Sequence, residues 1–360
     1  MPMLADLVDA VVGVDTHRDT HEAELALPTG SPIAVCSISN DSNGFAELLA
    51  WIGDHAPGPR VVVSIEGSRS FGVGVARAVA AAGFVVVECE QPHRKARRGK
   101  GKSDSIDAHL AVLTALRLDP ARLPTPRADG DREALRILLG TRHELTGTAT
   151  AQANRLRALL LSDDDETRQL ARRPLTDAVL TLLAGRCEPA AAGREQQVRH
   201  AEIRRLALAV LAARRELEAN REQLQIIVDD LAPGLTQRRG VGPVSGAQVI
   251  VSFSHAGRCR NDAAFAALAG TSPVQASSGR TVRHRLNRGG DRALNCAIHT
   301  IALTRIRCCP TTKAYVARRT AEGKTSREIR RCLKRYIARE LYRALATTMP
   351  TPVSTPTLTA

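Results

Sequence analysis

The first hundred residues alternate apolar runs of the strand type with helix-type segments, and this order constrains the fold more than any other feature. Strand-type runs lie at residues 11–14, 24–27, 33–36, 61–65 and 84–87, and helix-type segments lie at residues 44–52 and 71–82. Three strands joined by short turns, then helix, strand, helix and strand, are the element order of a ribonuclease-H-like mixed sheet with helices on its faces. We therefore predict an α/β N-terminal domain of this class.

The charge of the chain restricts its partners. Its 51 Lys and Arg residues against 37 Asp and Glu residues give a net charge of +14, which favours a polyanion such as nucleic acid or an anionic membrane surface. We expect neither a membrane segment nor a signal peptide, because the N-terminal apolar run contains Asp6 and Asp9. Eight cysteines without a CxxC pair suit reduced thiols, so the expected location is the cytoplasm.

The middle of the chain is predicted to be helical and to separate two functional halves. Residues 131–161 have a helical pattern, and acidic, Pro and Gly residues predict loops at 162–166 and 189–193. Apolar residues then recur every seventh position from Ile203 to Leu231, with Asn220 as a candidate register-setting residue. Four heptads are about equally compatible with a coiled coil and with one long helix packed within its own subunit.

Four acidic residues are placed as in a metal site. Asp15 ends the first predicted strand and Glu66 ends the fourth, so their carboxylates emerge at one edge if these strands are neighbours. Asp104 and Asp107 lie three residues apart on the opening turns of a predicted helix and share one face. Clustered carboxylates repel each other, and divalent cations bound through oxygen, with Mg²⁺ the physiological choice, compensate this repulsion.

A pair of such ions is a standard device of phosphodiester chemistry, since the ions activate the attacking oxygen and stabilise the leaving oxygen. Three of the four acids also have a structural interpretation. Asp15 could be a turn residue at a strand end, and Asp104 and Asp107 could complement a helix dipole. Taken singly, these acids are better explained by such structural roles.

A basic segment directly precedes the acidic pair, and its cations are Arg94, Lys95, Arg97, Arg98, Lys100 and Lys102. We interpret it as a phosphate-binding loop at the rim of the carboxylate site, although elsewhere a run of this kind is usually a solvated surface. Aromatic residues make up only 2% of the chain, so base-stacking platforms are scarce. Recognition should therefore rest on backbone charge and shape.

Two segments of the C-terminal half each allow two interpretations. Residues 239–246 are compatible with a helix-hairpin-helix turn, whose glycines let backbone N–H groups approach a DNA phosphate, and equally with a plain turn between helices. A zinc site can be drawn from Cys296, His299, Cys308 and Cys309. Helical packing explains these residues better, because structural zinc usually has tightly spaced ligand pairs.

Two adjacent serines, Ser277 and Ser278, lie in a Gly-containing segment with five arginines, namely Arg280, Arg283, Arg285, Arg288 and Arg292. A serine hydroxyl can attack a phosphodiester if a base or metal removes its proton and cations stabilise the pentavalent state. Composition alone favours a phosphate-binding loop over a nucleophile.

These motifs, in this order, resemble those of the DEDD insertion-sequence transposases, the family that includes the Piv-type DNA invertases and the bridge-RNA-guided recombinases. The most specific pieces are Ile-Glu66-Gly, then Lys-Ser-Asp104-Ser-Ile-Asp107-Ala, and then Phe-Ala-Ala-Leu-Ala-Gly followed by Ser278-Gly and Gly-Asp-Arg292. The resemblance covers nearly the whole chain. One departure is that Asn287 and Gly289-Gly290 interrupt the basic residues usual after the Ser-Gly turn, which puts the local phosphate contacts in doubt.

The resemblance implies a RuvC-like domain of ribonuclease H fold whose catalytic, metal-binding tetrad is Asp15, Glu66, Asp104 and Asp107. It also implies a nucleophilic serine that precedes a glycine, a position that Ser278 fits, with Ser277 as the fallback. The tetrad of one subunit and the serine of another would form a composite site that passes through a covalent serine–DNA intermediate. Heptad pairing gives a physical reason to expect a homo-oligomer, a dimer or a tetramer.

The same resemblance implies partners and domain limits. The partners would be double-stranded DNA and a non-coding guide RNA, with base pairing reading the sequence. The expected parts are a RuvC-like domain at 1–128, a helical or coiled-coil region at 129–232, a mainly α C-terminal transposase domain at 233–348 and a disordered tail at 349–360. Two alternatives are a metal-dependent junction nuclease, which would need only the tetrad, and a non-catalytic nucleic-acid-binding protein.

Overall fold

The computed structural model describes residues 3–89, 104–186, 193–275, 284–285, 287 and 289–349. The chain forms two compact units: one contains the residues before Ala134 together with those after Gln248, and the other is Ala134–Gln248. Within the described part, none of the helices is both long and apolar enough to span a membrane.

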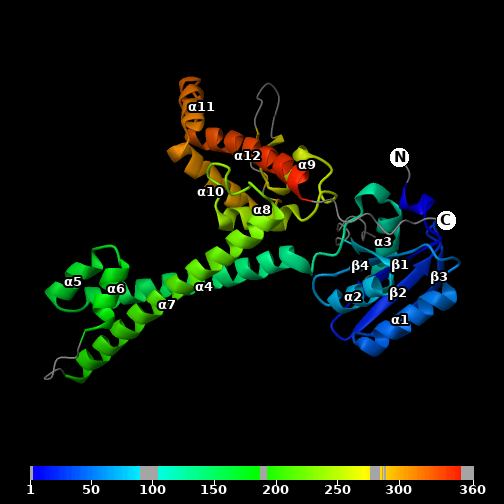
Figure 1. Ribbon diagram of the computed structural model, residues 1–360, viewed down its shortest axis with the longest axis horizontal. Coiled ribbons are helices and arrows are strands. Elements are labelled where there is room, and N and C mark those ends of the chain that lie inside the picture. The colour runs from blue at the N-terminus through cyan, green and yellow to red at the C-terminus, as the bar shows by residue number, and fades with distance from the viewer. Residues whose placement is uncertain are drawn as a thin grey trace. The chain divides into compact units, whose positions relative to one another are not determined.

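The N-terminal part of the first unit is a mixed sheet covered by helices (Figure 1). The sheet order is β3-β2-β1-β4-β5, with β1 antiparallel to β2, β2 antiparallel to β3, and β1, β4 and β5 parallel. Its elements are β1 (Ala10–Thr16), β2 (Thr20–Ala26), β3 (Pro32–Ser39), α1 (Ser42–His55), β4 (Val61–Glu66), α2 (Val73–Ala81), β5 (Val85–Cys89) and α3 (Asp104–Leu116), with short 3-10 turns at Leu4–Asp6 and Pro120–Arg122. The predicted α/β order of three strands, helix, strand, helix and strand is confirmed.

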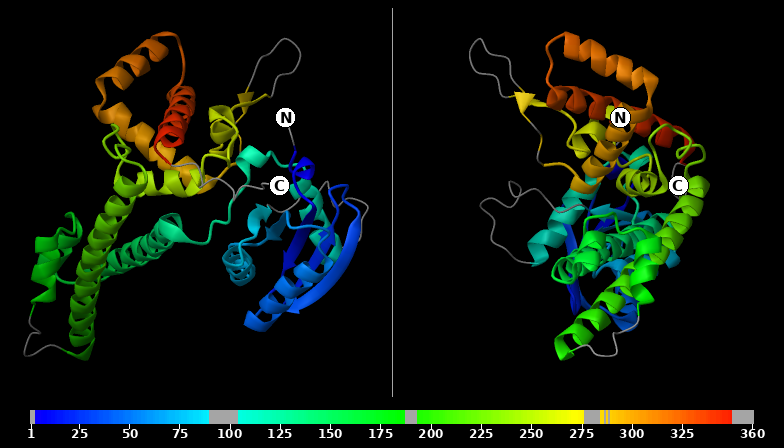
Figure 2. Two further views of the ribbon diagram at one scale, coloured as in Figure 1. Left: turned by 45° about the vertical axis from the view of Figure 1, so that its right-hand side comes forward. Right: turned by 90° about the vertical axis from the view of Figure 1, so that its left-hand side faces the viewer.

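Alternate residues of the central strands feed two different apolar cores. Val14 and Ile65 belong to the core under α1 and α2, whereas Val11 and Val62 pack with Val112 of α3 on the other face. Figure 2 shows the sheet with these helices on its two faces. The sheet is therefore the middle of three layers. Of the described helices α1, α2 and α3, the first two cover one face of the sheet and α3 covers the other.

The second unit contains α4 (Gly130–Leu161, whose first turn precedes the unit), α5 (Asp165–Ala171), α6 (Asp177–Ala184) and α7 (Arg194–Leu231). The N-terminal half of α7 packs in one apolar core with α6 and with the C-terminal turns of α4, through Ile203, Leu156 and Leu160. Asn220 Nδ2 donates to the carbonyl oxygen of Leu138, 2.9 Å away, so the polar heptad residue faces α4 of its own chain. The long helix packed within its subunit is thus observed, and a coiled coil between subunits remains a prediction.

The loop predicted at residues 162–166 is partly wrong, because α5 begins inside the acidic run. Asp164 is the N-cap and accepts from the backbone N–H of Thr167 at 2.7 Å, while Asp165 and Glu166 lie in the first turn. Acidic residues stabilise the positive end of a helix, so the run begins a helix rather than forming a loop. The loop predicted at 189–193 lies mostly outside the described residues.

The C-terminal region is mostly helical, as predicted, and contains one short antiparallel ribbon. Its elements are α8 (Pro243–Phe253), α9 (Asp262–Leu268), β6 (Val274–Gln275), β7 (His284–Arg285), α10 (Arg292–Cys308), α11 (Pro310–Ala321) and α12 (Ser326–Thr348). Phe253, Phe265 and Tyr342 form an aromatic cluster with ring centroids 5.8–6.0 Å apart, which joins α8, α9 and α12. This packing holds α9, the helix that directly precedes the β6–β7 ribbon, against α8 and α12.

Candidate functional site

Asp15 and Glu66 lie at the adjoining ends of two neighbouring parallel strands. Val14 of β1 is paired with Ile65 of β4, and the two acids follow one position later. Their residues are only 7% and 6% exposed. The structure therefore brings these two sequence-predicted residues together at one edge of the sheet.

The face on which these acids lie is fixed by the residues two positions earlier. Gly13 pairs with Ser64, and a Cβ added to Gly13 would lie 2.1 Å from the carbonyl oxygen of Ala108 in α3. Ser64 Oγ donates to the carbonyl oxygen of Ala111, 3.0 Å away. Since side chains alternate along a strand, Asp15 and Glu66 point toward the face that α3 covers.

Asp107 is the third buried carboxylate on this side of the sheet. It directly precedes Ala108, the residue that approaches Gly13, and it is 7% exposed. One turn of helix places Asp107 and Ala111 on the same side of α3, and Ala111 accepts the bond from Ser64. The small residues at the contact thus allow α3 to come close and carry Asp107 with it.

Two histidines contact acids at this site. His17 Nε2 lies 3.3 Å from Asp15 Oδ2, and its side chain is about half exposed. On the same face, Glu24 is the register partner of Gly13 in β2, and its Oε1 lies 2.5 Å from Nδ1 of His109 in α3. We did not predict this second contact from the sequence; the signal was a charged residue inside a strand with apolar neighbours.

The described carboxylates do not by themselves form a metal cage. Among the residues that the structure describes, no group of three or more His, Cys, Asp and Glu side chains is arranged to hold a metal ion. Asp104 is the first residue of α3, but its side chain is not among those that the structure describes. The donor type still fits a hard divalent cation, because the acids offer only carboxylate oxygens. The same finding covers the alternative zinc site, whose Cys296 and Cys308 are exposed on α10.

Most of the predicted phosphate-binding residues lie outside the described residues. These are Arg94, Lys95, Arg97, Arg98, Lys100 and Lys102 of the basic segment, and Ser277, Ser278, Arg280, Arg283 and Arg288 of the serine segment. Two arginines of the serine segment are described: Arg285 is exposed in β7, and Arg292 is exposed as the first residue of α10. The pairing of Gln275 with His284 brackets residues 276–283.

A basic hollow lies at the base of this ribbon, and we define it by its cationic lining residues Arg285, Arg331, Lys334 and Arg335. Gly270 and His284 also line it. Lys334 Nζ donates to Asn295 Oδ1 at 2.5 Å, and burial lowers the pKa of this amine. The three cations from α12 were missed by sequence reasoning, because basic residues spaced along an amphipathic helix look like an ordinary solvated face.

The Gly-Gly-Asp segment after the ribbon has a structural role. A Cβ on Gly290 would lie 2.4 Å from the backbone nitrogen of Gly270, so only glycine fits this approach without a shift. Asp291 then caps α10 by accepting from the N–H of Leu294, and it also accepts from Ser252 Oγ at 2.7 Å. These contacts tie the ribbon's second strand to α8 and α10.

The segment at 239–246 joins α7 to α8 through a turn in which Gly240 has a φ of 84°. Both interpretations of this segment, the helix-hairpin-helix turn and the plain turn, fit such a conformation. Its role in DNA contact therefore stays a prediction.

Comparison with known proteins finds matches to transposase families over both the acidic site and the serine segment. Residues 12–162 match the DEDD transposase family of the IS110 type, described as a transposase, and residues 233–317 match the family described as Transposase IS116/IS110/IS902. The first match includes all four predicted acids, and the second includes the serine segment. The chain belongs to the IS110 family of transposases.

Two relatives of this IS110-family transposase occur in Streptomyces coelicolor. An uncharacterised protein of insertion element IS110 is 24% identical, covering 88% of this chain and 89% of its own length. A transposase candidate of the IS117 mini-circle is 25% identical, covering 89% of this chain and 90% of its own length. The similarity therefore extends over both the acidic site and the ribbon region.

The family assigns an enzyme class and a substrate. The protein is a DNA transposase, an enzyme that acts on DNA, and the net charge of +14 suits this polyanionic substrate. A DEDD transposase domain is associated with dependence on a divalent metal ion.

Proposed function

We propose that Asp15, Glu66, Asp104 and Asp107 form the Mg²⁺-binding catalytic site of a RuvC-like domain, and that Ser278 is the nucleophile of DNA cleavage and rejoining. The observation that carries this proposal is the burial of Asp15 and Glu66 at adjacent strand ends, with Asp107 buried on the helix that covers them. Three buried carboxylates on one face are costly without a cation, so their presence favours metal binding.

The sheet supports the ribonuclease-H-like part of the proposal. Its order β3-β2-β1-β4-β5, with the first three strands antiparallel and the last two parallel to β1, has the central strand β1 carrying Asp15. A carboxylate on the central strand and another on its parallel neighbour converge at one edge. This arrangement suits a site that must reach the backbone of a nucleic acid.

The chemistry follows from the residue types. Divalent metal at the tetrad would supply Lewis-acid stabilisation of the charge on the reacting phosphate. The hydroxyl of Ser278 gives up its proton and forms an Oγ–P bond, while one P–O bond to a sugar oxygen breaks and that oxygen takes a proton. Reversal with a new sugar hydroxyl releases Ser278 and restores a phosphodiester, so the number of phosphodiester bonds is conserved.

Binding of the DNA backbone is assigned to the basic residues of the two segments and to the basic hollow. Arg285 and Arg292 are the members of the serine segment that the structure describes, and Arg331, Lys334 and Arg335 of α12 are described in the basic hollow. We propose guidance by a non-coding RNA on the basis of the family resemblance and the positive charge. A dimer or tetramer in which one subunit's tetrad meets another's serine is proposed from the family resemblance, as are domain limits at 128, 232 and 348. A cytoplasmic location is proposed from the cysteine pattern and the N-terminal sequence.

The experiment uses the full-length protein with element ends, flanking transcript and Mg²⁺, and detects protein-linked DNA on denaturing gels. Wild type should give a covalent adduct, and Ser278→Ala and Asp104→Ala should both lose it. Ser277→Ala is the matched control and should keep the adduct. A Ser278→Ala protein that still nicks DNA, with only Asp104→Ala inactive, would make the protein a metal-dependent nuclease. Salt-sensitive DNA binding without cleavage by any variant would favour the non-catalytic alternative.

A further inference from the structure

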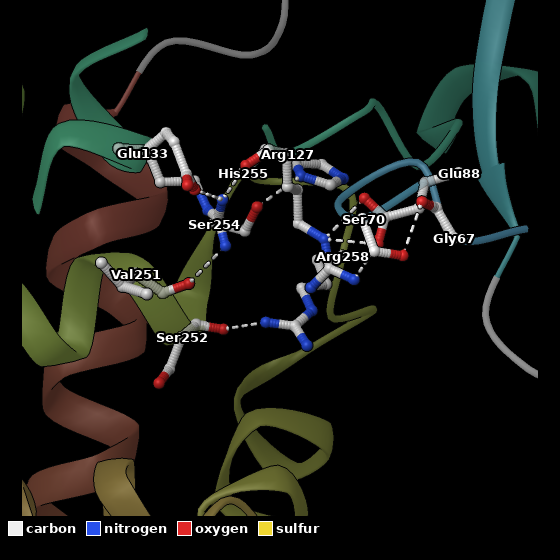
Figure 3. Close-up of polar contacts among 11 residues, drawn as sticks. Gly67, Ser70, Glu88, Arg127, Glu133, Val251, Ser252, Ser254, His255 and Arg258 are labelled. Carbon is white, nitrogen blue, oxygen red and sulfur yellow. Dashed lines mark hydrogen bonds and ion pairs between the residues drawn. The ribbon is translucent and has the colours of Figure 1, made fainter. Parts of the chain in front are cut away.

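A second pocket lies beside the acidic site, and we call it the arginine pocket (Figure 3). Its volume is about 290 Å³, and its lining includes Ser64, Glu88, Cys89, Arg127, His255 and Arg258. Cys89 is the register partner of Glu66, and Ser64 lies two residues before Glu66 on β4. The pocket is therefore one strand away from a proposed metal ligand.

Positive charge is concentrated around this pocket. Arg127 is 8% exposed and binds Glu88, itself 7% exposed, through Nε at 2.8 and 2.9 Å. Arg258 Nη1 donates to the carbonyl oxygen of Ser252, 2.5 Å away. Figure 3 shows this contact on the side of the cluster away from Glu88. This contact anchors the guanidinium of Arg258 at the lining of the pocket.

A third arginine extends the cluster. Arg132 donates to the carbonyl oxygens of Arg127 and Val251. Its pKa is lowered to about 10, first by burial and then by the charges of Arg127, Arg69 and Arg258, while Glu133, 3.9 Å away, acts in the opposite direction. Burial disfavours any charge, and only the three neighbouring arginines contribute a positive potential here. The cluster would accept an anion with a gain in electrostatic free energy.

His255 supplies a donor or acceptor that the described protein leaves unused. The residue is 7% exposed, its Nδ1 lies 3.1 Å from Ser254 Oγ, and its buried Nε2 has no hydrogen-bond partner among the described residues. The preceding Ser254 has a φ of 68°, an uncommon conformation for a residue other than glycine. When Ser254 donates to Nδ1, the ring proton is on Nε2, which is then a buried hydrogen-bond donor of a residue that lines the pocket.

We propose that the arginine pocket binds a phosphate group. Guanidinium forks and an imidazole N–H match the several acceptor oxygens of phosphate, and the carboxylate of Glu88 is already engaged by Arg127. We assign this phosphate to the DNA backbone, next to the strand that the tetrad cuts, and only this assignment rests on the proposed function. Free inorganic phosphate has the same chemistry and is distinguished by experiment.

The test uses substitutions at Thr114, an exposed residue of α3 that lines the pocket. Thr114→Glu adds a negative charge to the pocket, and Thr114→Gln is a matched control of nearly the same size and helix propensity without the charge. Inorganic phosphate is titrated into full-length protein at constant ionic strength, and its dissociation constant is measured by calorimetry. We expect saturable binding to wild type and Thr114→Gln, and binding at least tenfold weaker to Thr114→Glu.

A second pair of variants tests the arginine itself. Arg258→Ala should abolish phosphate binding, whereas Arg260→Ala, an exposed arginine of the same loop that does not line the pocket, should leave it unchanged. Equal phosphate affinities of Thr114→Glu and Thr114→Gln would overturn the proposal, even if Arg258→Ala failed to fold. The proposal would also be overturned if chloride, titrated at the same ionic strength, gave the same binding isotherm in the calorimeter as phosphate.

The source of the phosphate is decided with a short DNA duplex. If the pocket holds a backbone phosphate, Thr114→Glu should bind the duplex several-fold more weakly than Thr114→Gln. Equal duplex affinities, with phosphate binding still different, would assign the pocket to the free ion. Neither assay needs metal, Ser278 or strand cleavage, so loss of cleavage with intact phosphate binding would overturn only the proposed function.

Discussion

Gly13 of β1 lies so close to α3 that a Cβ built on it would be 2.1 Å from the carbonyl oxygen of Ala108. This contact determines how near α3 comes to the sheet, and Asp107 is the neighbour of Ala108 on that helix. The absence of a side chain at position 13 therefore sets the separation between Asp107 and the acids at the strand ends.

Gly13→Ala should push α3 away from β1 and destabilise the N-terminal sheet, because a backbone carbonyl cannot rotate away as a flexible side chain can. Overpacking of this kind costs about 3 kcal/mol. The free energy of unfolding in urea measures it. Gly53→Ala is the control, since a Cβ there meets nothing within 4 Å, and it should be neutral or stabilise by up to about 1 kcal/mol. Equal midpoints for the two variants would contradict the close packing of α3.

Mg²⁺ should stabilise the wild-type protein through the buried acids. A ligand at one hundred times its dissociation constant stabilises the folded state by about 2.7 kcal/mol, which corresponds to a rise of a few degrees in Tm. Asp107→Asn should lose this rise, because the amide replaces a charged ligand oxygen. Asp54→Asn, an exposed acid of α1, should keep it. Thermal unfolding with Mg²⁺ and with EDTA is the measurement, and a rise retained by Asp107→Asn would exclude that residue as a ligand.

The basic hollow should contribute phosphate contacts to DNA binding. Arg331→Ala is expected to weaken duplex binding several-fold and to reduce the slope of log affinity against log salt by about 1, as for one lost phosphate contact. Arg327→Ala removes the same charge from an exposed position of α12 that does not line the hollow, and it should have a smaller effect. Fluorescence anisotropy at several salt concentrations measures both. Equal slopes for the two variants would mean that only overall charge matters.

The order of strands and helices along the N-terminal chain and the acidic strand ends could be predicted, because apolar runs of Val and Ile that end in Asp15 or Glu66 are local patterns. The Glu88–Arg127 pair could not, since 38 residues separate the two along the chain and only the fold brings them together. Glu88 nevertheless carried a signal: it is a charged residue inside the apolar run Val85-Val-Val-Glu-Cys, and buried charges require partners.

The acidic run before α5 shows a different limit. The acidic composition of residues 162–166 predicts a loop, yet the structure uses Asp164 as an N-cap. Capping residues and loop residues are of the same chemical types, so composition cannot separate them. The basic residues of α12 were missed for a related reason: which side of a charged helix meets a second element depends on tertiary packing.

The buried imidazole of His255 should make the protein less stable in mild acid. Its pKa is lowered to about 4 from an ordinary 6.5, mainly by burial and further by Arg127, Arg258 and Arg132, while Glu88 acts in the opposite direction. Between these two values the unfolded chain binds a proton that the folded protein does not. Stability therefore falls as the pH falls from 6.5 toward 4, by about 2 kcal/mol at pH 5 for this group alone.

His255→Gln should remove this part of the acid sensitivity, because an amide does not titrate in this range. The measurement is the free energy of urea unfolding at pH 7 and pH 5 in phosphate-free buffer, so that no anion occupies the arginine pocket. His143→Gln, an exposed histidine of α4, should keep the wild-type difference between the two pH values. If His255→Gln loses as much stability as wild type on going to pH 5, then the pKa of His255 is the same in the folded and the unfolded protein, and burial does not lower it.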